Sequence, residues 1–214
     1  ARAARGPRHG LDFYSSREPL ALFYDHTYRI SWDLHAGERT RLLFSRVLGY
    51  AVPPRCDYGI RAVPRRFDWL GTGPYAVLLH ASSGAYKLWH ESNWIELGNA
   101  LNAAGIVCVL PWGNVREQER SARIAGRLDA AVLPPPLDLD ELAGLMAGGK
   151  TVVGVDTGLT HLAAALGVPT VGIYIGTDPA ATGIYGCARA RNLGGIGLAP
   201  GVRQVMMAVA ELSA

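Results

Sequence analysis

One stretch of the chain, Asp156-Thr-Gly-Leu-Thr-His161, has the residue types and spacing to bind a phosphate. An apolar run that predicts a buried strand ends just before it, and a predicted helix begins within it. Free N–H groups at a helix start, together with the helix dipole, favour an anion. Gly158 would let a phosphate approach the backbone, and Thr157 and Thr160 would add hydroxyl donors.

The two ends of this stretch, Asp156 and His161, suit contacts to a sugar. A carboxylate accepts hydrogen bonds from sugar hydroxyls, and helical spacing places His161 on the side of the helix that carries Thr157 and Thr160. From the residues alone, the alternative is that Asp156 only caps the helix and that His161 is a core histidine. Both interpretations stay open at this point.

A second polar loop, His80-Ala-Ser-Ser-Gly-Ala-Tyr-Lys87, also follows an apolar run. The adjacent hydroxyls of Ser82 and Ser83 would be directional donors to a diphosphate, and Lys87 would supply a point charge. Lys87 and Lys150 are the only lysines of the chain. The alternative is an ordinary loop with a solvated lysine.

Two further loops come after predicted strands. The first contains Glu117 and Glu119, and a carboxylate here could hold a ribose diol, as acidic residues do beyond strand ends in dinucleotide folds. It could equally be an acid favoured by the dipole of its helix. The fourth loop, Gly176-Thr-Asp-Pro179, has the residues of a tight turn, so a structural turn is the favoured interpretation there.

Several other functions are disfavoured. Asp138-x-Asp140 resembles a metal-binding motif, but it follows three prolines at a predicted helix start, where acids are favoured without a metal. No histidine and cysteine spacing is typical of zinc. The sequence has no GxGxxG, P-loop or GxSxG motif, which argues against a dehydrogenase, a P-loop enzyme and a serine hydrolase. We predict neither a metal nor a cofactor.

The elements that must position these loops alternate regularly from residue 75 onward. This alternation predicts an α/β fold with a parallel sheet, whose ligands bind beyond the carboxyl ends of the strands. The predicted strands are residues 76–79, 106–110, 131–133, 151–155 and 170–174. The predicted helices are residues 91–104, 115–125, 138–146, 159–166 and 202–212.

The first part of the chain reads differently. A helix is predicted over residues 35–48, with an apolar face made by Leu43, Phe44, Val47 and Leu48, but no strands alternate with it. We therefore predict that residues 1–66 are the tail of an N-terminal domain plus a linker, and that residues 67–214 form a C-terminal domain. We interpret the chain as cut from something longer.

Charge is concentrated in the same first part. Residues 1–66 hold 12 Arg and 6 acidic residues, a net charge of 12 − 6 = +6. This favours an anionic partner such as a phosphorylated lipid or a membrane surface, although solvated arginines explain it equally well. Nucleic acid is disfavoured, because no basic motif studded with aromatic residues occurs. The odd count of three cysteines favours a reducing compartment.

Taken together, the loops resemble the ADP-heptose:lipopolysaccharide heptosyltransferases, with the type I enzymes as the closest match. The resemblance spans nearly the whole chain. It is carried by His80-Ala-Ser-Ser with Lys87 and Trp89, Leu110-Pro-Trp-Gly with Glu117, Asp156-Thr-Gly-Leu-Thr-His161, Gly176-Thr-Asp-Pro179, Gly183-Ile-Tyr-Gly186, and upstream by Ser16-Arg-Glu-Pro19 and His35-Ala-Gly-Glu-Arg39.

The resemblance implies a GT-B glycosyltransferase, here with a Rossmann-like C-terminal domain and a remnant of the N-terminal domain. It implies that the C-terminal domain binds ADP-heptose, with the adenine against residues 133–138. The family's site residues then map onto Ser82, Ser83, Thr157 and Gly158 at the diphosphate, Lys87 and Asp156 near the heptose or its phosphate, Glu117 at the ribose, and His161 in the same pocket.

The implied reaction is an inverting, metal-independent transfer of heptose to Kdo of Kdo-lipid A. It implies a cytoplasmic protein, peripheral at the inner membrane. The family's general base, an aspartate, belongs to the N-terminal half that this chain largely lacks, so no catalytic residue is assigned. The alternatives are a non-catalytic nucleotide-sugar-binding module and a GT-B-like nucleotide-sugar epimerase.

Overall fold

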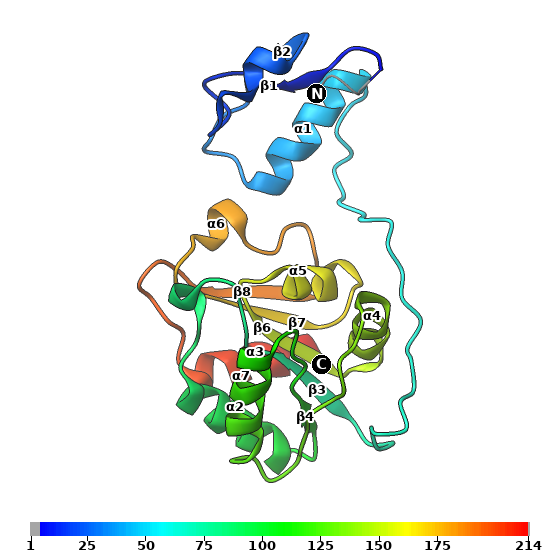
Figure 1. The fold of residues 1–214 in the computed structure, drawn as a ribbon, viewed down its shortest axis with the longest axis vertical. Helices are drawn as coiled ribbons and strands as arrows, with labels where there is room; N and C mark the ends of the chain where they lie inside the picture. Colours follow the sequence, from blue (N-terminus) through cyan, green and yellow to red (C-terminus); the bar gives the residue numbers. More distant parts are fainter. Residues whose placement is uncertain (1–4, 214) are drawn as a thin grey trace.

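The computed structural model describes residues 5–213, which form two unequal parts (Figure 1). The larger part is a six-stranded sheet with the strand order β5-β4-β3-β6-β7-β8, and every neighbouring pair is parallel. Its strands are β3 (Tyr75–Leu79), β4 (Val107–Val109), β5 (Ala131–Val132), β6 (Thr151–Val155), β7 (Thr170–Tyr174) and β8 (Ala190–Gly194).

Helices cover both faces of this sheet. They are α2 (Glu91–Ala103), α3 (Val115–Ala125), α4 (Leu139–Gly148), α5 (Gly158–Ala165) and α7 (Val202–Ser213). The central strands β3, β6 and β7 are buried at every residue, which explains why they read as continuous apolar runs. The predicted α/β parallel-sheet fold is therefore confirmed.

Alternate residues of β3 supply two separate cores. Ala76 and Leu78 join the core under α2, α3 and α7, whereas Val77 and Leu79 join the one under α4 and α5. This follows from the two-residue period of a strand, which sends successive side chains to opposite faces. The carboxyl end of β3 is thereby fixed from both sides, and the loop that follows it starts from a rigid point.

Helix caps fix the loop ends on the same edge. The Asp138 carboxylate accepts a hydrogen bond from the Glu141 N–H at 2.8 Å, and the Glu141 carboxylate accepts one from the Asp138 N–H at 3.1 Å. This reciprocal pair is a capping box at the start of α4. The structure thus gives Asp138 the helix-capping role that the sequence favoured over a metal site.

The smaller part contains more regular structure than the sequence predicted. Strands β1 (His9–Leu11) and β2 (His26–Tyr28) pair in parallel, a short 3-10 helix (Pro19–Phe23) lies between them, and α1 (Ala36–Leu48) follows. The expectation that this region has no strands was wrong. Each strand has only three residues and a polar composition, so no periodic apolar signal marks it.

The predicted apolar face of α1 exists but is largely uncovered. No residue of the helix is buried, and Phe44 and Leu48 are 53% and 67% exposed. Gly49 ends the helix in the left-handed conformation, with φ of 71°, as a glycine C-cap does.

Two elements of the larger part were missed. The strand β8 has a sequence of mixed polarity and lies at the sheet edge, so it lacks the apolar run that marks the inner strands. The predicted turn at 176–179 continues into α6 (Pro179–Thr182), a single helical turn capped by Asp178. Among residues 5–213, no helix is long and apolar enough to cross a membrane.

The two parts touch through α1 and the loop after α6 (Figure 1). The His35 ring stacks on Tyr185 with ring centroids 4.7 Å apart, and His35 Nε2 lies 3.0 Å from the carbonyl oxygen of Gly183. Residues 50–74, hereafter the connecting segment, hold no helix or strand and run alongside the larger part to β3.

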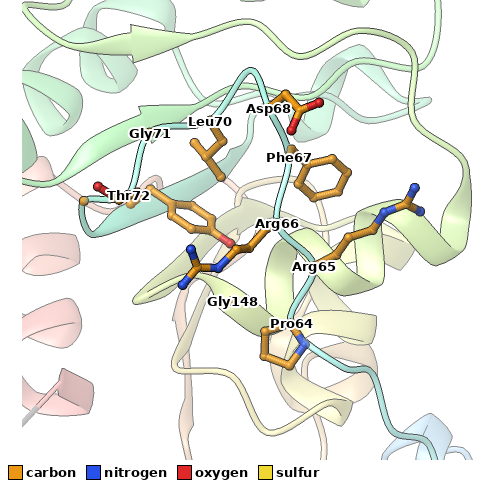
Figure 2. Close-up of a pocket in the computed structure, with 11 residues that line it drawn as sticks. Pro64, Arg65, Arg66, Phe67, Asp68, Leu70, Gly71, Thr72 and Gly148 are labelled. Carbon is orange, nitrogen blue, oxygen red and sulfur yellow. The ribbon is translucent and has the colours of Figure 1, made fainter.

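The end of the connecting segment lines a cavity of about 450 Å³ (Figure 2). Tyr75 and Gly148 form its other wall. Tyr75 is the first residue of β3, so this cavity lies at the amino end of the strand. The polar loops of the candidate site follow the opposite, carboxyl ends of the strands, where ligands of parallel sheets bind.

Candidate functional site

The loops that follow β3, β4 and β6 meet at the carboxyl edge of the sheet. They enclose a cavity of about 220 Å³. Its walls include the predicted residues Ser82, Ser83, Glu117 and Thr157. Four predicted positions from three separate segments of the chain are therefore brought to one cavity, together with Leu137, which belongs to the segment predicted to hold adenine.

A charged cluster made by Lys87, Asp156 and His161 extends the site beyond the walls of this cavity. Lys87 Nζ lies 2.8 Å from Asp156 Oδ2, and His161 Nε2 lies 3.5 Å from Asp156 Oδ1. The hydroxyl of Thr177 donates a hydrogen bond of 2.8 Å to Asp156 Oδ2 as well. The side chains of Lys87 and Asp156 are 21% and 10% exposed, so this ion pair is well shielded from water.

The carboxyl group of Asp156 stays ionised in this setting. Burial alone raises its pKa, but the hydrogen bonds from Lys87 and Thr177 and the charge of Lys87 outweigh burial, so the pKa lies below its ordinary value. A buried carboxylate held by side chains from the loops after β3 and β7 and from α5 is a preorganised acceptor for hydroxyl groups.

The structure contradicts one of the two interpretations of the stretch 156–161, namely a helix cap at Asp156 with a core histidine at His161. Asp156 does not cap α5, because Thr157 is the N-cap residue and no side chain caps that helix end. The His161 side chain is 37% exposed, so it is not a core histidine. The alternative interpretation was therefore wrong on both counts.

One proposed donor of this stretch was also wrong. Thr160 is fully buried, and its hydroxyl donates to the carbonyl oxygen of Val155 at 2.7 Å. Its position on the first turn of α5 points it back into the fold. By contrast, a Cβ placed on Gly158 would meet no atom within 4 Å, so a ligand has room to approach the backbone at this residue.

The paired serines divide their roles. Ser82 Oγ donates to the carbonyl oxygen of Asp156 at 3.1 Å, which ties the loop after β3 to the loop after β6. Ser83 is exposed in the cavity wall. The first serine thus fixes the geometry of the site, and the second presents its hydroxyl to whatever occupies the cavity.

Glu117 both lines the cavity and stabilises the start of α3. Its Oε2 accepts a hydrogen bond from the Gly113 N–H at 2.8 Å, and its Oε1 accepts one from Asn114 Nδ2 at 2.8 Å. These bonds support the alternative interpretation, in which this acid is favoured at the start of its helix. A ribose contact would have to share these oxygens, each of which has a second lone pair.

Two residues of the site were not singled out from the sequence. His80 directly follows β3, lines the cavity and is fully buried, with its Nε2 2.6 Å from Ser121 Oγ. Burial and the nearby charge of Arg120 lower the pKa of His80 to about 4, so the ring is neutral at pH 7. Thr177 lies in the loop for which a structural turn was favoured over ligand contact. For both residues, the available signal was a position just after a buried strand, at the carboxyl edge of the sheet.

Among the described residues, no group of three or more histidine, cysteine, aspartate or glutamate side chains could hold a metal ion. The positive charge at the site comes from Lys87 and from the start of α5. Together with hydroxyls and a carboxylate, this set is suited to a sugar joined to a diphosphate.

Comparison with known proteins agrees with this chemistry. The sequence model of glycosyltransferase family 9 (heptosyltransferase) matches residues 1–204. Lipopolysaccharide heptosyltransferase 1 of Salmonella typhimurium is 42% identical over 200 residues, which are 90% of this chain and 63% of that protein.

Solved structures agree as well. E. coli heptosyltransferase WaaC with ADP superposes with a TM-score of 0.85 at 38% identity, covering 99% of this chain and 67% of that one. The same enzyme with ADP-2-deoxy-2-fluoro heptose gives a TM-score of 0.80 at 38% identity, covering 98% and 66%.

The fold and these matches define the class of protein: a parallel-sheet α/β protein of the GT-B glycosyltransferase type. More closely, the chain belongs to glycosyltransferase family 9, the heptosyltransferase family. The resemblance drawn from the loops is confirmed. The chain spans 63% of the length of its Salmonella relative.

Proposed function

We propose that this chain binds ADP-heptose as the donor half of an enzyme that transfers heptose to Kdo of Kdo-lipid A, with inversion and without a metal. In this proposal residues 67–214 are the donor domain, and residues 1–66 are the end of the acceptor domain plus a linker. The observation that carries it is the meeting of Ser83, Glu117 and Thr157 in one cavity beside the Lys87–Asp156 pair.

The proposed roles combine the geometry of the site with the family resemblance. The N–H groups at Thr157 and Gly158 and the hydroxyl of Ser83 hold the diphosphate, and Lys87 balances the charge that develops on departing ADP. Asp156 and His161 contact heptose hydroxyls, Glu117 binds the ribose, and adenine lies against residues 133–138. Lys87 replaces a metal ion here because it already sits at the site as a fixed positive charge.

The acceptor would meet the smaller part. Arg39 stacks over Trp32 at 3.8 Å, Arg17 lies 5.7 Å from the same ring, and Arg29 lies 4.7 Å from the ring of Tyr14. None of these three arginines forms an ion pair with a carboxylate among residues 5–213. Kdo and lipid A phosphates carry negative charge, so this cluster supports an anionic lipid acceptor at the cytoplasmic face of the inner membrane.

Calorimetry with ADP and ADP-heptose, in EDTA and beside UDP-sugars, tests the donor proposal. We expect selective binding of the adenine nucleotides that EDTA leaves unchanged and that Lys87→Ala weakens at least tenfold. Lys150→Ala is the matched control, because it removes the only other lysine and lies at the start of β6, the opposite end of that strand from Asp156. A folded chain with equal affinity for UDP-sugars and ADP-heptose would reject the proposal and favour an epimerase-like site.

A transfer assay with Kdo-lipid A tests the reaction itself. The anomeric configuration of the product, read by NMR, reports inversion. Tight ADP-heptose binding without transfer would instead support a non-catalytic nucleotide-sugar-binding module. Co-sedimentation with vesicles of anionic lipid tests the membrane contact: Arg17→Ala/Arg39→Ala should weaken it, and rising salt should weaken it further.

A further inference from the structure

Two cysteines far apart in the sequence lie at one small cavity outside the candidate site. Cys56 belongs to the connecting segment and Cys187 to the loop between α6 and β8, and both line a cavity of about 200 Å³. Both side chains are partly exposed, whereas Cys108 is buried in the core. The pair is therefore accessible to small molecules, and the third thiol is not.

The backbones around the two thiols approach closely. Gly186 precedes Cys187, and a Cβ placed on it would lie 2.4 Å from Cys56 Cβ and 3.9 Å from Cys56 Cα. Only glycine leaves room here, and its φ of 66° suits glycine as well. Gly186 is in contact with Cys56, and the Cα of the next residue, Cys187, lies about 3.8 Å further along the chain. The two cysteines therefore lie close to the separation that a disulfide needs, with Cα atoms about 4.4–6.8 Å apart.

The side chains converge on a shared acceptor. The Cys187 thiol donates to the carbonyl oxygen of Tyr185 at 3.4 Å, and Tyr58 Oη donates to the same oxygen at 2.7 Å. Burial raises the pKa of Tyr58, and the thiols of Cys56 and Cys187 raise it further. The pKa of Cys187 is also raised, mainly by burial and in addition by the Cys56 thiol. Cys56, Tyr58 and Cys187 all line the same cavity.

We propose that Cys56 and Cys187 form a reversible disulfide by exchange with a small-molecule disulfide such as oxidised glutathione. The Cys56 thiolate attacks one glutathione sulfur and releases glutathione thiolate. The Cys187 thiolate then attacks Cys56 in the mixed disulfide and releases the second glutathione thiolate. The two cysteines are oxidised, one glutathione disulfide is reduced to two thiols, and the two cysteine protons go to solvent or to the released thiolates.

The bond would tether the connecting segment to the larger part. Cys56 lies between α1 and the part of the segment that reaches β3, and Cys187 follows the Tyr185 ring on which His35 stacks. Oxidation would thus lock the contact between the two parts of the chain, and reduction would release it. This proposal does not depend on the identity of the donor nucleotide.

Peptide mapping of the oxidised full chain tests the proposal directly. The chain is treated with oxidised glutathione, denatured in the presence of iodoacetamide so that every free thiol is blocked, and digested with trypsin without reductant. We expect residues 56–61 to be covalently joined to residues 151–189, with the Cys108 peptide only alkylated. The intact chain should lose about 2 Da, the mass of two hydrogens, and dithiothreitol should reverse both changes.

Matched variants make the outcome unambiguous. Cys108→Ser should keep the joined peptide, and Cys56→Ser and Cys187→Ser should each abolish it and leave a glutathione adduct on the remaining thiol. Separate adducts on Cys56 and Cys187 in the unsubstituted chain, or equal pairing with Cys108, would overturn the proposal. Both readouts are made on the chain itself and do not require nucleotide binding.

Discussion

Lys87 Nζ and Asp156 Oδ2 lie 2.8 Å apart although 69 positions (156 − 87) separate the two residues in the chain. The loop after β3 brings the cation, the end of β6 brings the carboxylate, and β3 and β6 are hydrogen-bonded neighbours in the sheet. Adjacent parallel strands thus place the two groups at one edge, and the pair joins the proposed phosphate-binding and sugar-binding groups.

Removal of the Lys87 ammonium group should raise the pKa of Asp156 and destabilise the fold. In Lys87→Met, the carboxylate loses its charge partner and one hydrogen bond, so burial dominates and the pKa of Asp156 rises. Leaving a shielded charge unpaired costs about 3 kcal/mol or more of the free energy of unfolding at pH 7. Urea unfolding measures the loss, and carbonyl ¹³C NMR follows the titration of Asp156.

The sign of the pH dependence provides a second check on the same variant. Because the pKa of Asp156 is lowered by folding, its contribution to stability is present above the ordinary aspartate value and disappears as pH falls through the folded-state value. Lys87→Met should therefore lose stability at pH 7 but little at low pH. Equal losses at both pH values would mean that Lys87 acts only through packing.

Thr177 should act as a positioning residue for Asp156. Thr177→Val keeps the shape but removes the hydroxyl that donates to Oδ2, so the pKa of Asp156 should rise and ADP-heptose affinity should fall about tenfold, the effect of about 1.4 kcal/mol. Thr177→Ser should restore both. Thr182→Val is the matched control, since the Thr182 hydroxyl bonds to the Asp178 carbonyl and not to the site. A shift in affinity without a shift in the Asp156 titration would contradict this role.

The inner strands and the loops after them could be predicted because they obey short-range rules. A strand such as β6, buried at every residue, has to be a continuous apolar run, and the polar stretch after it then lies at the carboxyl edge. Ser82, Ser83 and Thr157 met in one cavity for that reason. Family resemblance added what periodicity could not, namely which ligand such a cavity would hold.

What failed depended on side-chain packing, on a distant partner, or on strands too short to show a pattern. Thr160 has a donor side chain at the spacing of a ligand residue, and only the packing of α5 on β6 turns its hydroxyl toward Val155. Thr177 looked like part of a turn, because its partner Asp156 is 21 positions earlier. The strands β1 and β2 have three residues each, too few to show a period.

Glu117 stabilises the start of α3 and is proposed to bind the ribose. Ribose analogues distinguish these two roles. Glu117→Gln should weaken ADP binding about tenfold by removing a charged acceptor. Binding of 2′,3′-dideoxy-ADP, which lacks both ribose hydroxyls, should be weak in the parent chain and unchanged by the substitution. Calorimetry of the four combinations gives the coupling energy between Glu117 and the hydroxyls. Equal losses for both nucleotides would assign Glu117 to capping alone.

The buried His80 should make the fold sensitive to mild acid. Its pKa falls from the ordinary 6.5 to about 4 in the folded chain, chiefly because burial disfavours the charged ring and also because Arg120 lies near it. The unfolded chain therefore binds a proton at higher pH than the folded chain does. Stability should be fully present above pH 6.5, fall as pH drops, and level off below about pH 4 as far as this residue is concerned.

The size of this effect follows from the difference between the two pKa values, and amounts to about 3 kcal/mol. Urea unfolding at pH 7, 6 and 5 measures it. His80→Gln, whose amide can still reach Ser121, should flatten the dependence over that range, whereas His26→Gln, at an exposed position, should keep it. If both variants kept the parent's dependence of unfolding free energy on pH, protonation of His80 would not cause the loss of stability in acid. The neutral ring near the loop of Ser82 and Ser83 would then matter only for its shape.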